Sequence, residues 1–200
     1  YILRDAVSGK YRLSLRLYEL AHVHSPVREM LQASLRPMQQ LAETLRESCH
    51  ISVLSGGGVV VMAQAESPER VRMSVEVGAR FPPLHTVSGR MLLSYLEPEE
   101  LERTLGDDPE YRAAGRARRR AIRQRLAQIR AQGYATAENE TFIGVFDVAV
   151  LAGNPRIGLM AALAAPLWER PGRKLATRKF VQGLKDCART ITLNLGLTPP

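Results

Sequence analysis

The segment from His85 to Arg90 combines residue types that could bind a polar or anionic ligand. Backbone N–H groups at the start of a helix have no partner inside the helix, and Gly89 would let a ligand approach them closely. The hydroxyl of Thr86 or Ser88 could add another hydrogen bond. Because the same hydroxyls are common helix caps, the residues alone favour capping over a ligand site.

Asp147 is an acidic residue inside an otherwise apolar strand pattern that runs from Val145 to Val150. Strand alternation places its side chain on the same face as those of Val145, Ala149 and Leu151. A buried, ionised carboxylate is costly unless it is paired, protonated or facing a wet cavity. Asp147 therefore either lines a pocket or hydrogen-bonds to a backbone group or an arginine.

The other reactive residue types have no spaced partners. The sequence contains no Cys-x-x-Cys, His-Glu-x-x-His or Gly-x-Ser-x-Gly pattern, so we expect no metal ligands, no cofactor, no catalytic residues and no enzymatic activity. Solvated or capping roles are expected for the histidines, and buried positions for the two cysteines: His22, His24, His50, His85, Cys49 and Cys187.

Length and composition fit one folded domain, or one domain with a structured arm. The chain has 200 residues, 45% of them hydrophobic, and a formal net charge of +8, which permits contact with nucleic acid without requiring it. No apolar run approaches the roughly 20 residues needed to cross a bilayer, and the N-terminus does not have the pattern of a signal peptide. Two cysteines make no disulfide framework. These features predict a soluble, cytoplasmic protein with no membrane partner.

Hydrophobic periodicity predicts an alternation of helices and strands. A strand ending near Tyr11 leads into a helix, and Ser25-Pro26 begins a second helix whose apolar stripe continues past Pro37. Residues 71–77 form the clearest half-buried strand pattern. We expect further strands at residues 51–53, 59–63, 134–138, 145–151 and 157–165, and helices at residues 91–96, 99–105, 116–130 and 181–195.

This order predicts an α+β fold, an antiparallel sheet with helices packed on one side. In the helix expected at residues 116–130, Ile122, Leu126 and Ile129 line one face and many arginines lie on the other. We interpret this arginine-rich face as solvated and assign it no binding role.

Five segments together resemble the effector-binding part of IclR-type bacterial transcription regulators. They are DAVSGKYRLSLRLYEL, LRPMQQLAETLRESCHISVL, RFPPLHTVSGRMLLSYLEPEEL, IRAQGYATAENETFIGVFDVAV and GLMAALAAPL, and their order and spacing cover nearly the whole chain. The resemblance implies a GAF/PAS-like domain with adjacent N- and C-terminal helices, a homodimer or homotetramer, and a small-molecule effector pocket between the sheet and its covering loops.

The resemblance also implies a winged helix-turn-helix domain that reads operator DNA and is mostly missing from this sequence. Residues 1–24 would be the remnant of its wing and the connecting helix, and residues 25–200 the effector-binding domain. Binding of the effector would change the spacing between the DNA-binding domains of the oligomer.

The resemblance to the IclR family bears on both candidate segments. It implies that residues 85–90 border the effector pocket, so a ligand site at these residues becomes as well supported as helix capping. Asp147 occupies a pocket position where many relatives have cysteine. This chain departs from the family at Ala164 and Pro166, where serines are common, and at Ala137, where an acid is common.

These departures remove hydroxyl groups that could bind a small carboxylate. We therefore expect a larger hydrophobic or aromatic ligand whose hydroxyl or amine group donates a hydrogen bond to Asp147. The expected ligand-binding residues are Met73, Phe81, Thr86, Val87, Ser88, Gly89, Val145, Asp147, Ala164 and Pro166. The alternative is a structural oligomerisation domain whose pocket is closed by Phe81, Met73 and Leu151.

Overall fold

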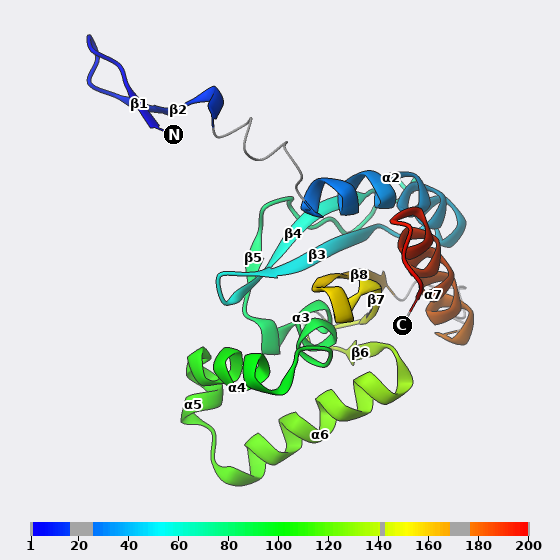
Figure 1. The fold of residues 1–200 in the computed structure, drawn as a ribbon. Coiled ribbons are helices and arrows are strands. Elements are labelled where there is room, and N and C mark those ends of the chain that lie inside the picture. Colours follow the sequence, from blue (N-terminus) through cyan, green and yellow to red (C-terminus); the bar gives the residue numbers. More distant parts are fainter. Residues whose placement is uncertain (1, 17–25, 141–142, 169–176, 200) are drawn as a thin grey trace.

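The computed structural model describes residues 2–16, 26–140, 143–168 and 177–199, and Figure 1 shows their arrangement. The helices are α2 (Pro26–Leu45), α3 (Val87–Leu93), α4 (Pro98–Asp107), α5 (Pro109–Ala113), α6 (Arg116–Gln132) and α7 (Thr177–Asn194). The strands are β1 (Ile2–Arg4), β2 (Tyr11–Leu13), β3 (Cys49–Ser55), β4 (Gly58–Ala65), β5 (Arg80–Phe81), β6 (Ala135–Glu138), β7 (Val145–Asn154) and β8 (Leu159–Trp168). Short 3-10 turns occupy Pro83–His85 and Pro155–Ile157.

The main sheet has six antiparallel strands within these ranges, in the order β5-β4-β3-β8-β7-β6. Its longest pairing is the β7–β8 hairpin, which pairs continuously from Val145 opposite Trp168 to Asn154 opposite Leu159. β3 joins the two halves of the sheet, because it pairs with β4 on one side and with β8 on the other. The antiparallel α+β fold predicted from the sequence is confirmed.

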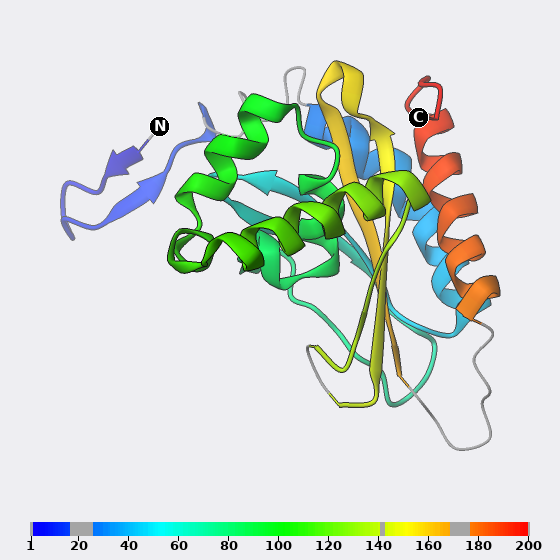
Figure 2. The same ribbon diagram turned by 90° about the horizontal axis from the view of Figure 1, so that it is seen from below.

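Helices α2 and α7 lie together on one face of the sheet (Figure 2). The alternation of β7 sends Val148 and Val150 into this larger core. An amide hydrogen bond from Asn194 to the carbonyl of Ala33, 3.2 Å long, ties the two helices together. The predicted adjacency of N- and C-terminal helices is therefore confirmed for α2 and α7, which form the helical layer on that side.

The opposite face of the sheet is covered by α3, and α6 packs over α3. Ala149 and Leu151 of β7 point to this face and contact Val87 and Met91 of α3, while Ile129 brings α6 into the same cluster. This second layer positions the candidate site, because the residues of β7 that face it include Asp147. Helix α6 ends at Gly133, whose φ of 73° is the left-handed conformation expected of a glycine cap.

One strand prediction is wrong. Residues 71–77 form an irregular segment, and β4 pairs instead with the two-residue strand β5. The Gln64 side chain, and not a neighbouring strand, holds this segment against β4. Its Oε1 accepts a hydrogen bond from the backbone N–H of Val75, and its Nε2 donates one to Ser74 Oγ. Burial does not follow strand alternation in this segment, because Val71 and Val77 are exposed while Met73 and Val75, at the same alternate positions, are partly buried.

The predicted strand end at Tyr11 is present as β2, which pairs with β1. Most of the predicted connecting helix and the cap at Ser25 lie outside the described residues, so the division at residue 24 stays a prediction. Helix α2 begins at Pro26 and continues through Pro37, as the apolar stripe indicated. None of the helices in the described ranges has the length and apolar character that a bilayer crossing requires.

Candidate functional site

A cavity of about 430 Å³ lies between the sheet, the irregular segment after β4 and the start of α3. This effector cavity, as we call it, draws its walls from β3, β4, β5, β7 and β8. Its lining residues are His50, Ser52, Val59, Val61, Met73, Ser74, Val75, Phe81, Pro82, His85, Thr86, Val87, Ser88, Glu140, Val145, Asp147 and Pro166.

Eight of the ten residues expected from the sequence line this one cavity, although they come from five separate parts of the chain. They are Met73, Phe81, Thr86, Val87, Ser88, Val145, Asp147 and Pro166. Gly89 and Ala164 do not line it. Ala164 is 1% exposed and belongs to the core beneath α3. Leu151 lies in that core as well, so it does not close the cavity as the structural alternative expected.

Thr86 caps helix α3. Its backbone is extended, with φ −123° and ψ 151°, and its Oγ1 accepts a hydrogen bond of 3.0 Å from the N–H of Gly89. That N–H is therefore already satisfied within the protein. Gly89 also has a steric role, since a Cβ at this position would lie 2.1 Å from the carbonyl oxygen of Pro83. The expectation that Gly89 opens the helix start to a ligand is corrected accordingly.

Asp147 sits on β7 opposite Ala137 of β6 and Pro166 of β8. Its side chain is half-buried and lines the effector cavity together with Val145 and Pro166. Its charge also reaches Arg90, where it helps to raise the pKa of the guanidinium group. The strand face predicted for Asp147 is thus the face that the structure gives it.

His50 and Ser52 are lining residues that the sequence analysis did not select. Burial lowers the pKa of His50 to about 4, so its imidazole is neutral at physiological pH, and the expected solvated or capping role is wrong for this histidine. Ser52 Oγ is buried and has no hydrogen-bond partner among the described residues. A signal existed, because His50 and Ser52 alternate with the buried Ile51 and so share the other face of β3.

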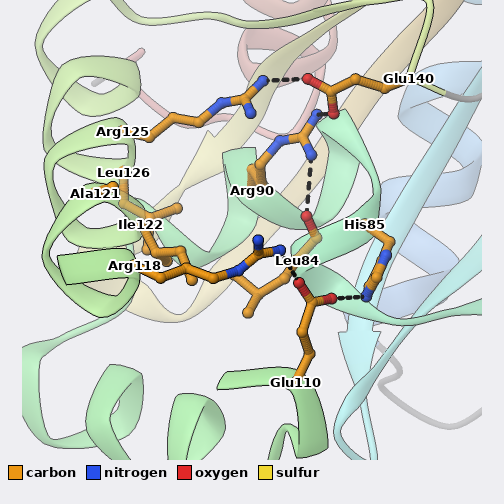
Figure 3. A pocket seen from close by; sticks show the side chains of 10 residues that line it. All are labelled: Leu84, His85, Arg90, Glu110, Arg118, Ala121, Ile122, Arg125, Leu126 and Glu140. Carbon is orange, nitrogen blue, oxygen red and sulfur yellow. Dashed lines mark hydrogen bonds and ion pairs between the residues drawn. The ribbon is translucent and has the colours of Figure 1, made fainter. Parts of the chain in front are cut away.

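A second cavity, of about 510 Å³, lies on the far side of His85 and Glu140, between α3, α5 and α6 (Figure 3). We call it the outer cavity. His85 and Glu140 line both cavities and so form the boundary between them. The outer cavity is lined by Leu84, His85, Arg90, Glu110, Arg118, Ala121, Ile122, Arg125, Leu126 and Glu140.

Two carboxylates in the outer cavity each bridge two basic groups (Figure 3). Glu140 lies 2.9 Å from Nη2 of Arg90 and 2.6 Å from Nη2 of Arg125. Glu110 pairs with Arg118 and lies 2.6 Å from Nε2 of His85. Helix α6 is therefore connected to both residues that separate the cavities: Arg125 pairs directly with Glu140, and Arg118 reaches His85 through Glu110.

Burial and charge shift the pKa values of the Arg90–Glu140 pair. Burial lowers the pKa of Arg90 and the nearby charge of Arg125 lowers it further, while Glu140 opposes both effects. Burial alone would raise the pKa of Glu140, but Arg125 and Arg90 outweigh it and lower that pKa. Both groups are consequently charged at neutral pH, and Glu140 stabilises the buried cation. No cluster of three or more possible metal ligands occurs within the described residues.

An antiparallel sheet that holds a partly apolar cavity with a few convergent polar groups is typical of a small-molecule binding domain. Residues 24–193 match the family described as bacterial transcriptional regulator IclR C-terminal, and the chain belongs to this family. It is the C-terminal domain of an IclR-type transcriptional regulator. Its relatives are regulators and not enzymes, which confirms the prediction of no enzymatic activity.

Curated relatives show this similarity along most of the chain. The glycerol operon regulatory protein of Streptomyces coelicolor is 28% identical over 200 residues, covering 98% of this chain and 78% of the relative. The transcriptional regulator XynR of Escherichia coli is 30% identical over 166 residues, which is 82% of this chain and 66% of XynR.

Solved structures share the fold at lower identity. A Silicibacter chain assigned to the IclR transcriptional regulators superposes with a TM-score of 0.81 at 23% identity, covering all of this chain and 80% of that one. An IclR homologue of Microbacterium hydrocarbonoxydans, solved in complex with 4-hydroxybenzoate, gives a TM-score of 0.71 at 24% identity, covering 98% and 79% of the two chains.

Proposed function

We propose that this domain binds a small hydrophobic or aromatic metabolite in the effector cavity and thereby modulates operator binding by the regulator. The observation that supports the proposal most is Asp147, an acid that lines the cavity together with Met73, Phe81, Val145 and Pro166. Its cavity of about 430 Å³ falls in the range typical of small-molecule sites. The neighbour solved with 4-hydroxybenzoate supports an aromatic ligand.

The polar groups of the cavity favour hydrogen-bonding ligands over small carboxylates. Asp147 presents negative charge, whereas Glu140 is already paired with Arg90 and Arg125, and Pro166 supplies no hydroxyl from β8. A ligand carboxylate placed beside Asp147 would meet like charge, whereas a hydroxyl or amine would donate to it. The neutral His50 and the Ser52 hydroxyl, which has no partner within the described part of the chain, offer further hydrogen bonds for the ligand.

In the whole regulator, the domain would act as a cytoplasmic homodimer or homotetramer. Residues 1–24 would continue into a winged helix-turn-helix domain that contacts operator DNA. An effector that binds one arrangement of the oligomer more tightly than another would shift the population toward it and change operator affinity. Residues 25–200 would supply both the ligand site and the oligomer interface.

The ligand proposal is tested by calorimetry with p-cresol and toluene, which differ by one hydroxyl, and with glyoxylate and pyruvate. We expect p-cresol to bind more tightly than toluene, and the difference to disappear in Asp147→Asn. A hydrogen bond to a charged group contributes about 2 kcal/mol, so p-cresol should lose roughly tenfold or more in affinity. Asp107→Asn, at the exposed end of α4, is the matched control.

Three outcomes would contradict this proposal. Tighter binding of glyoxylate or pyruvate than of p-cresol would exclude the aromatic ligand class. Absence of ligand-dependent stabilisation across a metabolite panel in thermal-shift measurements would favour the structural alternative. For the regulatory step, equal operator affinity of the full-length regulator with and without its ligand would remove the sensing role.

A further inference from the structure

The outer cavity differs chemically from the effector cavity. Three guanidinium groups, from Arg90, Arg118 and Arg125, face two carboxylates, so the lining carries one excess positive charge when His85 is neutral. The effector cavity has Asp147 and no arginine among its lining residues, and Glu140 at its boundary is already paired with Arg90 and Arg125. The two cavities therefore suit ligands of different charge.

Arg90 is the least solvated of the three cations. It is 6% exposed, and its side chain extends from α3 toward Glu140 (Figure 3). Its Nη1 donates to the carbonyl of Leu84 at 3.0 Å, but its Nε has no hydrogen-bond partner among the described residues. Burial and the neighbouring Arg125 lower the pKa of Arg90, while Glu140 and Asp147 act in the opposite direction. An additional anion nearby would stabilise this cation.

Arg118 and Arg125 are the accessible cations. Their side chains are 66% and 44% exposed, and both reach from α6 toward the carboxylates that border the cavity (Figure 3). A guanidinium group can bind a second carboxylate oxygen with N–H groups that its first partner leaves free. These two arginines can therefore receive an anion without first losing Glu110 and Glu140.

The remaining wall is apolar. Leu84, Ala121, Ile122 and Leu126 line the side of the cavity that α6 and the turn before α3 contribute. A cavity with basic groups beside an apolar wall fits a molecule that has an anionic head and an apolar body. One excess positive charge fits one negative charge.

We propose that the outer cavity is a second ligand site, which binds an organic monocarboxylate through Arg118 and Arg125 and places its apolar body against Ile122 and Leu126. Because His85 and Glu140 separate this site from the effector cavity, the two sites are adjacent but distinct. The proposal does not depend on the identity of the effector.

Benzoate is the probe, and benzamide is its neutral match in shape. We expect benzoate to bind the 200-residue chain at least tenfold more tightly than benzamide and to shift the methyl resonances of Ile122 and Leu126. Arg118→Gln with Arg125→Gln should weaken benzoate at least tenfold. Arg116→Gln with Arg120→Gln, on the same helix but away from the outer cavity, should leave its affinity within twofold.

The Asp147→Asn variant distinguishes benzoate binding in the outer cavity from benzoate binding in the effector cavity. Benzoate affinity unchanged in Asp147→Asn supports the proposal, even if every effector candidate fails. Equal affinity for benzoate and benzamide would overturn it, as would full affinity in the Arg118/Arg125 double variant. Benzoate-induced shifts at Val87 and Val145 in place of Ile122 would also overturn it, because they would locate the probe in the effector cavity.

Discussion

The Glu140 carboxylate lies 2.9 Å from the guanidinium group of Arg90, a side chain that is 6% exposed. Its other oxygen lies 2.6 Å from Arg125, on a different helix. One carboxylate thus compensates a buried cation on α3, holds α6 in place and separates the two cavities. Removing its charge tests how much of the local structure depends on it.

Glu140→Gln should destabilise the fold by about 1–2 kcal/mol. Loss of one partner of a fully buried pair costs about 3–5 kcal/mol, and the partial exposure of Glu140 reduces that cost. Urea unfolding followed by circular dichroism measures the change. Glu138→Gln is the control, because Glu138 is exposed. Equal stability of the two variants would show that Arg90 does not need the Glu140 charge.

Two glycines in helices should respond in opposite ways to alanine. In Gly89→Ala, the new Cβ would lie 2.1 Å from the oxygen and 2.5 Å from the Cα of Pro83, which are backbone atoms. The turn before α3 would have to move, and overpacking of this kind costs about 1–3 kcal/mol. We expect a lower midpoint of thermal unfolding and weaker ligand binding in the effector cavity.

Gly183→Ala is the matched control, in the interior of α7. The nearest atoms to its added Cβ would be methyl groups of Leu45 and Leu41 at 3.5 and 3.6 Å, which is ordinary van der Waals contact. Since alanine favours the helix by roughly 0.5–1 kcal/mol over glycine, this variant should be more stable than the parent. A stable Gly89→Ala protein would contradict the close approach of Pro83.

Most of the sheet was predictable because its strands carry apolar residues, at alternate positions or in continuous runs, that are buried against the helices. Asp147 shows how far this reasoning extends: alternation alone places it on the face of Ala149. The error at residues 71–77 has the opposite origin. The consecutive residues Met73, Ser74 and Val75 all line the cavity, so the alternating pattern there does not separate two faces of a strand and carries no information on whether a neighbouring strand exists.

The outer cavity was not predictable from the sequence. Arg118 and Arg125 belong to a helix whose arginines fit a solvated face equally well, and their partners Glu110 and Glu140 are set by tertiary packing. Arg90 follows Gly89 in the segment 85–90, which the resemblance to the family placed beside the effector cavity and not beside the outer cavity. Nothing in the local pattern indicates that its guanidinium group is buried, since long basic side chains are usually solvated.

Cys49 and Cys187 should resist thiol reagents in the folded protein. Both are buried, and burial raises the pKa of each thiol to about 12, so the reactive thiolate is scarce at neutral pH. We expect labelling with a disulfide reagent to proceed only at the rate of unfolding, and fully in denaturant. Rapid labelling of either cysteine under native conditions would show that the core between α2, α7 and β3 opens readily.

His50 should make stability depend on pH between its two pKa values. Burial lowers its pKa from about 6.5 in the unfolded chain to about 4 in the folded one, so between these values the unfolded state binds one more proton. The free energy of unfolding is therefore highest above pH 6.5 and falls as the pH decreases toward 4. The loss from pH 7 to pH 5 should be about 2 kcal/mol.

Urea unfolding at both pH values measures this loss, and His50→Gln removes the contribution of the imidazole. Carboxylates contribute to the pH dependence of both proteins, so the difference between parent and variant isolates His50. We expect the variant to lose about 2 kcal/mol less than the parent over this interval. An identical pH dependence in the two proteins would mean that His50 reaches solvent in the folded state, and the effector cavity would then be wetter around β3 than its lining residues indicate.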